Sequence, residues 1–460
     1  MVNVKTIDFA AQFDRLKSMV SSDSLRMPIL IFAAALILRL LFMFIMFSDI
    51  GPGHLIDLYQ DPIKYVNAAD YLFGRADTGQ YELFLVGVGY PFLIALLTAI
   101  FGDIYWPILV VQLILSSLSC VLIYKIGELL IKNRIIAAIA GFLAAVSITS
   151  ISLANAILSE TLFFFLFILS LYLFFKGLAD NRWSTIIFAG IMGGLATLVR
   201  SVTMFYPVLL IVFALIYPVA KKAGERKRML IKSAVVALIM ITIPALWGLR
   251  NLEVHDTFTV SGTGVLATKT YLTGRVLISA QDRHVGKFTA LRDSLYRSSL
   301  AAYEAGNYRQ NQADDIEFII STVKRYPSLF LKNYLLIVLD NATAVSGLQY
   351  LHLPRYTKFF ENIDKYIHRG SNSPVVLVFS LIGFLILARK QLNISLILLL
   401  NVLYFALMSG ITFGQGSRIF FPAMSTQSIL AATAVLFFYD IVLIGRNFLF
   451  SRRRDQAEVP

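Results

Sequence analysis

The chain has 460 residues, of which 57% are hydrophobic and 15% are charged, and its formal net charge is +13. Together with a mean hydropathy of +0.72, this composition excludes an ordinary soluble protein and indicates a polytopic membrane protein. The basic residues gather in short stretches between apolar runs, so the positive charge indicates membrane orientation and not nucleic-acid binding. The single cysteine, Cys120, excludes an intrachain disulfide.

The N-terminal segment, residues 1–26, precedes the first long apolar run. Its apolar residues recur at helical spacing among lysines and arginines, which predicts an amphipathic helix on the cytoplasmic face. We expect no cleaved signal peptide, because no short apolar core with a small-residue cleavage site is present.

Apolar runs along the rest of the chain predict about ten transmembrane helices. With these crossings, every basic cluster in a short loop falls on the cytoplasmic side, as the positive-inside rule requires. The predicted fold class is therefore an all-α polytopic membrane protein. The expected spans are Met27–Phe47, Trp106–Ile131, Ile135–Thr149, Ala156–Phe175, Ser184–Val199, Val202–Ala220, Leu230–Leu249, Pro374–Ala388, Leu392–Ser409 and Ile419–Ile444.

Two large loops, 48–105 and 250–373, are predicted to face outward. Each holds a short apolar segment, Tyr90–Phe101 or Leu329–Leu339, which the alternation of sides makes an interfacial helix. The alternative for the second segment is that 329–349 crosses the membrane. The expected organisation is a transmembrane catalytic module with the first external loop, then a folded cap, then C-terminal spans with a basic cytoplasmic tail: 27–249, 250–373 and 374–460.

The first external loop contains the candidate catalytic acid, Asp61. Asp61 and Tyr65 are four residues apart, so on a helix both side chains lie on one face. A carboxylate near the membrane edge can take a proton from an attacking hydroxyl, which typically contributes about 10²–10⁴ to a rate. Because Pro62 follows, Asp61 also suits a helix N-cap, and the two roles are compatible. Asp49 and Asp57 are alternative acids in this loop.

Ionisable residues near the outer ends of predicted spans form a second set of candidates. Glu160 begins one span, where an acid is costly unless it has a partner or a function. A structural ion pair or a solvated acid is the alternative. Arg200, Arg250 and Arg418 face outward against the positive-inside rule, which suggests a shared anionic ligand such as a lipid phosphate. Each arginine could instead snorkel to the outer headgroups.

Arg39 lies in the middle of the first predicted span, and we expect it to have a buried partner, such as an acid on a neighbouring helix; direct catalysis is the alternative. The histidines are scattered and no cysteines pair, so we expect no zinc site. A phosphate-binding glycine-rich loop and a serine-centred hydrolase elbow are both absent, which argues against an ATP-driven pump and such a hydrolase. We expect no cofactor, and dependence on a divalent cation is left open.

Short motifs, none of them specific alone, follow one another over most of the chain. They are Asp61-Pro-Ile-Lys-Tyr65-Val-Asn-Ala68, Gly89-Tyr90-Pro91-Phe-Leu-Ile-Ala95, Leu158-Ser159-Glu160-Thr161, Gly194-Leu195-Ala196-Thr197-Leu198-Val199-Arg200, Arg250-Asn251 followed by Ser261-Gly262-Thr263-Gly264, and Arg418-Ile-Phe-Phe-Pro422. In this order they resemble the GT-C superfamily of integral-membrane glycosyltransferases. That group includes the protein O-mannosyltransferases and the transferase that adds aminoarabinose to lipid A.

The resemblance implies an inverting sugar transfer from a polyprenyl-phosphate donor to an acceptor hydroxyl on the extracytoplasmic face. Asp61 corresponds to the family's general base in the first external loop. Arg200, the basic residue of the Gly-Leu-x-x-Leu-x-Arg motif, would stabilise the departing lipid phosphate, and Glu160 and Tyr65 would line the donor pocket. The acceptor would be a glycan, a lipid or a protein, in the envelope of a bacterium or archaeon, with the enzyme in the plasma (inner) membrane.

Two departures from the family pattern narrow this expectation. Pro62 replaces the second acid of an Asp-Glu pair found in some members, which argues against a metal and a mannosyltransferase-type site. Val86-Gly87-Val88 stands where members often have a basic residue or proline, which removes one expected phosphate contact. The competing hypotheses are a transporter or flippase of lipid-linked glycans and an inactive scaffold for envelope assembly. Inverted repeats or broken spans in matching halves would favour the transporter, and neither is evident.

Overall fold

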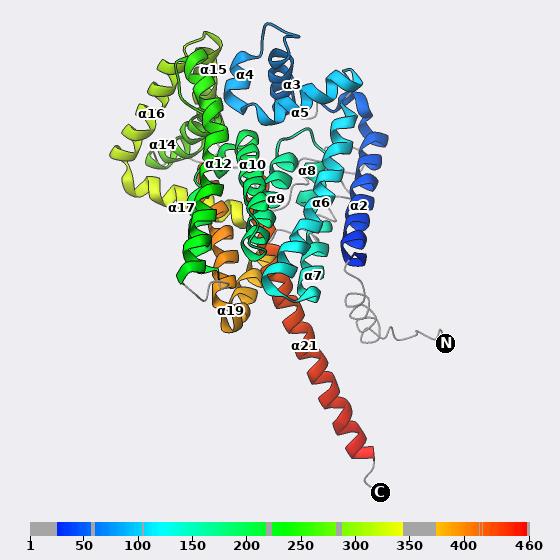
Figure 1. The fold of residues 1–460 in the computed structure, drawn as a ribbon. Coiled ribbons are helices and arrows are strands. Elements are labelled where there is room, and N and C mark those ends of the chain that lie inside the picture. Colours follow the sequence, from blue (N-terminus) through cyan, green and yellow to red (C-terminus); the bar gives the residue numbers. More distant parts are fainter. Residues whose placement is uncertain are drawn as a thin grey trace.

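The computed structural model describes residues 25–56, 60–103, 105–217, 223–281, 288–343, 374–413, 415 and 417–457. Within these ranges every regular element is a helix (Figure 1), and the predicted all-α membrane fold is confirmed. The amphipathic helix predicted for 1–26 lies outside the described residues, apart from residues 25 and 26, and so does the alternative acid Asp57.

The loop 48–105, which the sequence predicts to be the first external loop, folds mainly into short helices that pack on the end of the bundle. Helix α5 has only 13 residues, about 20 Å at 1.5 Å per residue, and is too short to cross a bilayer core of about 30 Å. Its first residue, Gly89, approaches the end of α10 so closely that an added Cβ would lie 2.6 Å from the backbone nitrogen of Val199. The elements here are α2 (Arg26–Ile50), η1 (Pro52–His54), α3 (Gln60–Leu72), α4 (Gln80–Val86) and α5 (Gly89–Phe101).

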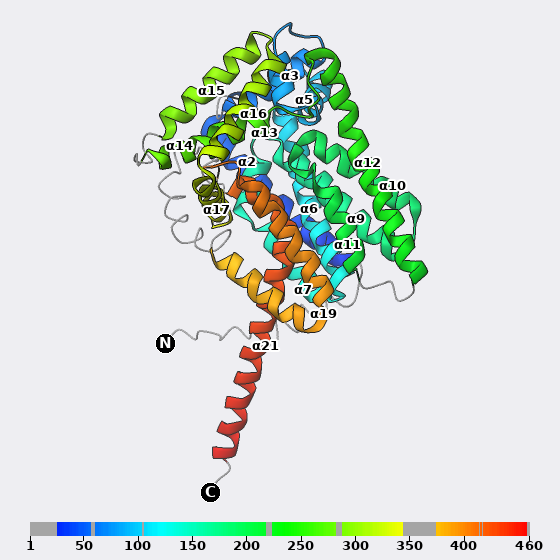
Figure 2. The same cartoon turned by 90° about the vertical axis from the view of Figure 1, so that its left-hand side faces the viewer.

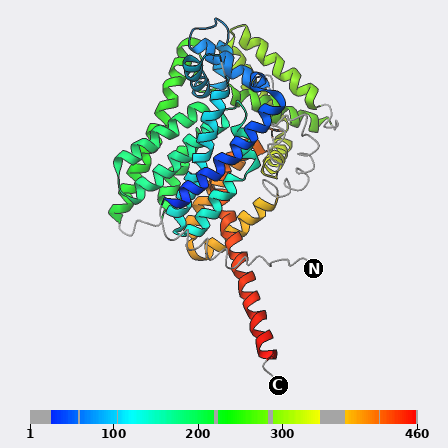
Figure 3. The same cartoon turned by 90° about the vertical axis from the view of Figure 1, so that its right-hand side faces the viewer.

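The central bundle follows, with one break that the apolar pattern did not predict. The predicted span Ile135–Thr149 is divided between two helices, α7 and α8, which are bent by 53° relative to each other. By contrast, α6 has the predicted bounds. The elements are α6 (Trp106–Ile131), α7 (Arg134–Ala145), α8 (Ile148–Ala154), α9 (Glu160–Ala179) and α10 (Trp183–Val199). Figure 3 shows α2 lying across the outside of this bundle.

Arg39, on α2, is fully buried and supports the break between α7 and α8. Its guanidinium donates hydrogen bonds to the hydroxyls of Ser116 at 2.8 Å and Ser150 at 2.7 Å. It also donates to the backbone carbonyls of Ala35 at 2.9 Å and Ala145 at 3.2 Å. Arg39 therefore has buried partners, as expected, but they are hydroxyl and carbonyl oxygens and not the acid given as an example. The carbonyl of Ala145, at the end of α7, gains a donor where the helix stops supplying one.

The next three elements are η2 (Ser201–Thr203), α11 (Tyr206–Ile216) and α12 (Ala223–His255). Helix α11 is shorter than the predicted span Val202–Ala220, of which residues 218–220 lie outside the described part of the chain. Helix α12 extends beyond the predicted Leu249 and packs against α10 and α11.

The cap consists of helices on the same end of the bundle as the first external loop (Figures 1 and 2). Its last helix, α17, lies against the end of α19: Tyr334 donates to the carbonyl of Leu407 at 2.6 Å, and Asn341 to those of Ser409 and Thr412 at 3.0 and 2.9 Å. The elements are α13 (Thr263–Ala267), the π-helix η3 (Thr268–Thr273), α14 (Gly274–Ala280), α15 (Phe288–Glu304), α16 (Tyr308–Arg325) and α17 (Pro327–Thr343).

Helix α19 (Pro374–Ser409) is a hairpin of the two predicted spans. Its backbone leaves the helical region at Gln391, next to the predicted boundary. On either side of that break, Ser380 donates to the carbonyl of Gln427 at 3.2 Å and Asn401 to the hydroxyl of Ser425 at 3.0 Å. Both halves therefore lie on one turn of α21. The last elements are α20 (Ser417–Phe420), η7 (Phe421–Ala423) and α21 (Met424–Ala457).

All ten predicted spans correspond to helices, but not all are long enough to cross alone. Six helices of the described chain are long and apolar enough, or seven if α7 and α8 form one bent span. Helices α10 and α11, with 17 and 11 residues, fall short. Helix α17 is not among those of spanning length; because 344–349 are not described, a crossing by 329–349 stays a prediction.

Candidate active site

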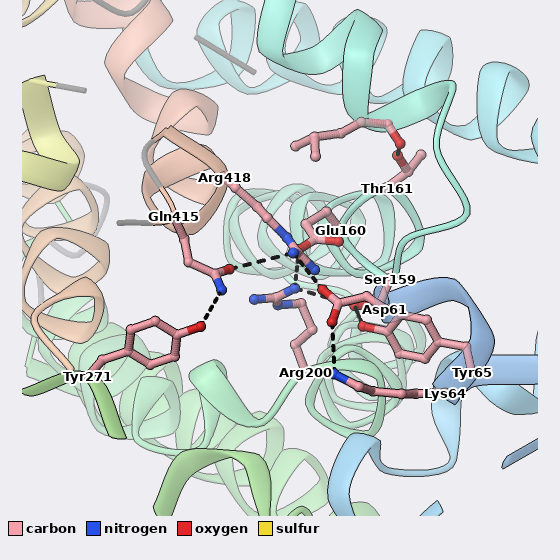
Figure 4. A network of polar contacts seen from close by, with 11 residues as sticks. Asp61, Lys64, Tyr65, Ser159, Glu160, Thr161, Arg200, Tyr271, Gln415 and Arg418 are labelled. Carbon is pink, nitrogen blue, oxygen red and sulfur yellow. Dashed lines mark hydrogen bonds and ion pairs between the residues drawn. The ribbon is translucent and has the colours of Figure 1, made fainter. Parts of the chain in front are cut away.

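Ionisable side chains from four segments far apart in the sequence meet in one network (Figure 4). Asp61 lies in the first turn of α3 and Glu160 in the first turn of α9. Arg200 is the C-cap of α10, and Arg418 lies in α20. The structure thus brings together four of the residues that the sequence singled out.

Each carboxylate oxygen of Asp61 faces one cation. Arg418 Nη1 donates to Oδ2 at 2.7 Å, and Lys64 Nζ donates to Oδ1 at 3.2 Å. Burial by itself would raise the pKa of Asp61, but the charges and hydrogen bonds of Arg418 and Lys64 hold it well below its ordinary value. Burial lowers the pKa of Lys64, yet the neighbouring Asp61 and Tyr296 raise it above its ordinary value. Asp61 is therefore an ionised carboxylate in this state.

Glu160 lies between the two arginines. Its Oε1 accepts hydrogen bonds from Arg200 Nη1 and from Arg418 Nε. The side chain is only 2% exposed. Its position in the first turn of α9 places the negative charge at the positive end of the helix dipole, which stabilises it.

Arg200 and Tyr65 both contact the Ser159 hydroxyl. The backbone of Arg200 is extended (φ −147°, ψ 120°), which ends α10. Its Nη1 also donates to the Ser159 hydroxyl at 3.3 Å, and the Tyr65 hydroxyl lies 3.1 Å from the same oxygen. The Tyr65 ring packs edge-on against Tyr90 at 4.9 Å. Burial, with the charges of Glu160 and Asp61, raises the pKa of Tyr65, so its phenol is neutral.

Two cavities share the Asp61–Arg418 pair as part of their walls. The larger, of about 440 Å³, has Asp61, Lys64, Arg200 and Arg418 at its polar part. Its remaining wall is largely apolar and comes from the end of α4, the end of α10, η2 and the two residues after it, the cap elements α13, η3 and α15, and the segments around the end of α19. The apolar residues there include Leu198, Val199, Val202, Met204, Phe205, Met408, Ile411 and Ile419.

The smaller cavity, of about 310 Å³, is bounded by the cap and is more polar. Helix α15 contributes Arg292, Asp293 and Tyr296, and η3 contributes Tyr271. The Arg292 guanidinium lies 5.8 Å from the centre of the Tyr271 ring, a cation–π distance. The two cavities adjoin along residues that line both of them, and the rest of the wall is more apolar in the larger cavity. The shared residues are Asp61, Lys64, Thr270, Tyr271, Tyr296, Gln415 and Arg418.

A polar link joins the cap to Arg418. Arg418 Nη1 donates to Gln415 Oε1 at 3.5 Å, and Gln415 Nε2 donates to the Tyr271 hydroxyl at 3.2 Å. The sequence did not single out Lys64, Tyr271, Tyr296 or Gln415. Lys64 could have been found, because a basic residue three positions after Asp61 lies on the same helical face. The other three carry no local signal, since only tertiary contacts bring them to the site.

Arg250 lies apart from this network and lines neither cavity. Its Nη1 donates to Asn251 Oδ1 at 3.0 Å and to His255 Nε2 at 3.2 Å, and its guanidinium lies 4.9 Å from the centre of the Trp247 ring. In the described part of the chain, no group of three His, Cys, Asp or Glu side chains could hold a metal ion. The expectation that the protein has no cofactor, with dependence on a divalent cation left open, stays a prediction.

Solved structures of archaeal oligosaccharyltransferases are similar to the chain. AglB from Archaeoglobus fulgidus, in complex with an inhibitory peptide and a dolichol-phosphate, is 14% identical, with a TM-score of 0.48 over 91% of this chain and 52% of that one. The apo form of the Archaeoglobus fulgidus oligosaccharyltransferase is 13% identical, with a TM-score of 0.48 and the same coverage. A form tethered to an acceptor peptide is 15% identical, with a TM-score of 0.49 over 90% and 50%. The chain spans about half the length of these proteins.

No curated protein matches the chain in sequence. A family model does match residues 86–247, and its description is dolichyl-phosphate-mannose-protein mannosyltransferase. This segment includes Glu160 and Arg200, whereas Asp61 and Arg418 lie outside it. Residues 86–247 are thus related to the dolichyl-phosphate-mannose-protein mannosyltransferases, and the resemblance to the GT-C glycosyltransferases that the sequence predicts is confirmed.

Proposed function

We propose that this chain is an inverting membrane glycosyltransferase that moves a sugar from a polyprenyl-phosphate donor to an acceptor hydroxyl. The transfer takes place on the extracytoplasmic face. One observation carries this proposal: Asp61 and Arg418 form an ion pair where an apolar-walled cavity meets a polar one. Asp61 would act as the base and Arg418 as a phosphate-binding cation, and both side chains line the two cavities.

The cavities differ in the way that the two substrates of such a reaction differ. The apolar wall of the larger cavity suits the prenyl chain, and Arg200 and Arg418 at its polar part suit the phosphate. The polar smaller cavity, with Tyr296 and Asp293 from the cap, suits the acceptor. Both substrates would then meet at Asp61.

In the proposed step, Asp61 takes the proton of the acceptor hydroxyl while its oxygen attacks the anomeric carbon. The bond from that carbon to the phosphate oxygen breaks, and its electron pair stays on the phosphate. Because attack and departure occur on opposite sides, the configuration inverts. Arg200 and Arg418 stabilise the charge that develops on the leaving phosphate.

The charges of the network balance over this step. Lys64, Arg200 and Arg418 are cations and Asp61 and Glu160 are anions, which leaves one positive charge. A sugar on a lipid phosphodiester brings one negative charge, and the sum is zero. After transfer the phosphate carries a second negative charge, but Asp61 has taken a proton, so the sum is again zero. No net charge develops at membrane depth, where it would be costly.

Asp61 must be released from Arg418 before it can act as a base. The donor phosphate competes for the same guanidinium and so provides that release. Since burial by itself raises the pKa of Asp61 and Arg418 lowers it, loss of this contact increases the proton affinity of the carboxylate. Donor binding would therefore precede proton transfer.

The test is transfer of a radiolabelled sugar from polyprenyl phosphate by the purified full chain in proteoliposomes, with a panel of sugars and membrane extract as acceptor source. We expect wild-type protein to move label from the lipid fraction to the acceptor and Asp61→Asn to lose at least about 10²-fold in rate. The Asp61→Asn protein should still bind the donor, because both arginines remain.

The matched control is Asp49→Asn, which changes the alternative acid of the same loop. Asp49 lies in α2 and lines neither cavity, so this variant should transfer sugar at the wild-type rate. Normal turnover by Asp61→Asn would reject the proposal, and so would equal losses in both variants. Movement of lipid-linked sugar across the bilayer without transfer would instead identify a flippase.

A further inference from the structure

Glu160 contacts Arg200 and Arg418, the candidate phosphate-binding residues, but does not itself line the cavity in which they lie. Its side chain is 2% exposed and contributes to the wall of neither cavity. Arg200, by contrast, lines the larger cavity, and Arg418 lines both. Glu160 can therefore affect a ligand in these cavities only indirectly, by way of the two arginines.

The two arginines come from different elements and share Glu160 as an acceptor. Arg200 ends α10 and Arg418 lies in α20, and each donates to the same oxygen, Oε1 of Glu160. Two cations this close repel each other strongly at the low dielectric constant of a protein interior. The carboxylate between them offsets that repulsion, and a guanidinium has five N–H donors, so both can still bind a further anion.

The second oxygen of Glu160 supports a role beyond packing. Oε2 is buried and accepts no hydrogen bond within the described part of the chain. An unsatisfied buried polar atom of a charged group is destabilising. An apolar side chain at this position would avoid that cost but would leave both arginines without their shared anion.

We propose that Glu160 is a positioning residue that holds Arg200 and Arg418 together as one anion-binding unit for the phosphate of a prenyl lipid. The inference rests on the proposed function for the identity of the ligand. Glu160 itself takes no proton and touches no substrate. Its charge sets the separation and direction of the two guanidinium groups, and hence the affinity for the donor.

The experiment measures binding of undecaprenyl phosphate, without a sugar, to the full chain in nanodiscs. We expect Glu160→Gln, which keeps the shape and removes the charge, to weaken binding at least tenfold. In transfer assays, the KM for the donor should rise by a similar factor, while kcat at saturating donor and the KM for the acceptor change less than threefold. Glu160→Asp, which restores the charge, should recover part of the affinity.

Glu128→Gln is the matched control. Glu128 also pairs with two cations, Lys125 and Arg134, each at 3.0 Å, but it lies on α6 away from both cavities. It should leave lipid binding unchanged. Unaltered binding and donor KM in Glu160→Gln would overturn the inference, and so would a loss of kcat alone. If Glu160→Gln does not fold, Glu160→Asp decides: its shorter side chain moves the charge away from the two guanidinium groups and should weaken binding in part. Wild-type affinity in Glu160→Asp, the same as in Glu128→Gln, would then overturn the inference.

The two proposals can fail separately. If wild-type protein binds undecaprenyl phosphate but transfers no sugar, the proposed function fails, and the binding comparison still decides the role of Glu160. If wild-type protein transfers sugar and Glu160→Gln matches it in donor KM and lipid affinity, only the positioning role is rejected.

Discussion

Arg418 Nη1 lies 2.7 Å from Asp61 Oδ2, although the two residues are 357 positions apart in the chain. The contact joins the first external loop to the start of the last membrane helix. Arg418 is 8% exposed and Asp61 34% exposed, so the pair is buried on the arginine side and open on the acid side. This asymmetry leaves the carboxylate accessible to an acceptor while the cation stays fixed.

The first prediction concerns pH. Because Arg418 and Lys64 hold the pKa of Asp61 below its ordinary value against the effect of burial, the carboxylate stays ionised at and below about pH 4. We therefore expect kcat/KM for the donor, which reports the free enzyme, to show no loss from Asp61 protonation between pH 7 and 5. Lys64→Met removes one of the two cations, so the pKa of Asp61 rises and the acid limb moves to higher pH. The measurement is a pH–rate profile of both proteins.

Lys64→Arg keeps the charge and is the control for this profile. The difference between the native and the unfolded pKa of Asp61 also determines how the free energy of unfolding depends on pH. A carboxylate with a lowered native pKa stabilises the fold above its unfolded pKa of about 3.9, and this contribution is lost as the pH falls through the native value. Acid unfolding of Lys64→Met should show a smaller dependence on pH below about 4. An identical acid limb in all three proteins would contradict the prediction.

Most of the helices could be predicted from the sequence because their causes are local. An apolar run of bilayer length predicts a span wherever it occurs, and α6 begins and ends at the predicted residues. The break between α7 and α8 could not be predicted. It depends on Arg39 of α2, which reaches the carbonyl at the end of α7 through a contact 106 positions away.

The candidate site could be predicted in its members but not in its geometry. Asp61 stood out as an acid near the membrane edge, and Glu160 because an ionisable group at a span end is costly. Arg200 and Arg418 stood out because they lie against the positive-inside rule. The sequence treated Arg200, Arg250 and Arg418 alike, yet only two of them line the cavities. Which arginines converge depends on the packing of α10, α12 and α20, and no spacing along the chain encodes it.

The second prediction follows from that difference between outward arginines. Arg200→Gln should raise the KM for the donor by about 10- to 100-fold, because it removes a charged hydrogen bond to the phosphate worth about 1.5–3 kcal/mol. Arg250→Gln should change donor KM and kcat by no more than about twofold, since Arg250 contacts Asn251, His255 and Trp247 instead. Steady-state kinetics with varied donor checks both. Equal effects of the two substitutions would contradict the assignment.

The third prediction concerns Arg39. Arg39→Met should leave the carbonyl of Ala145 without its side-chain donor and leave the hydroxyls of Ser116 and Ser150 with only the hydrogen bond between them, at 3.2 Å. Each unsatisfied buried group costs about 1–3 kcal/mol, so the thermal midpoint in detergent should fall by several degrees. Because Arg39 lines neither cavity, activity per folded molecule should fall much less than stability. Arg26→Met, exposed at the start of the same helix, is the control and should be nearly neutral.

The fourth prediction tests the buried ion pair that holds the cap together. Lys269 Nζ lies 2.5 Å from Asp315 Oδ1, and Ser299 Oγ donates to the same carboxylate, so η3, α15 and α16 meet at this point. The side chains of Lys269 and Asp315 are 11% and 1% exposed. Asp315→Asn leaves a buried cation without its anion and should destabilise the cap by about 3–5 kcal/mol.

Limited proteolysis of the cap, followed as a function of denaturant, measures this effect. The control is Asp256→Asn, which breaks a pair with Arg309 whose side chains are 67% and 73% exposed. Water and salt screen such a pair, so its loss should cost no more than about 1 kcal/mol. Asp256 has a positive φ of 52°, which asparagine tolerates, so the substitution adds no backbone strain.

Since Tyr271 and Tyr296 lie on the same two elements as Lys269 and Ser299, loosening of the cap in Asp315→Asn should also raise the KM for the acceptor. A stable cap with a normal acceptor KM in this variant would mean that the buried pair does not hold the smaller cavity in shape.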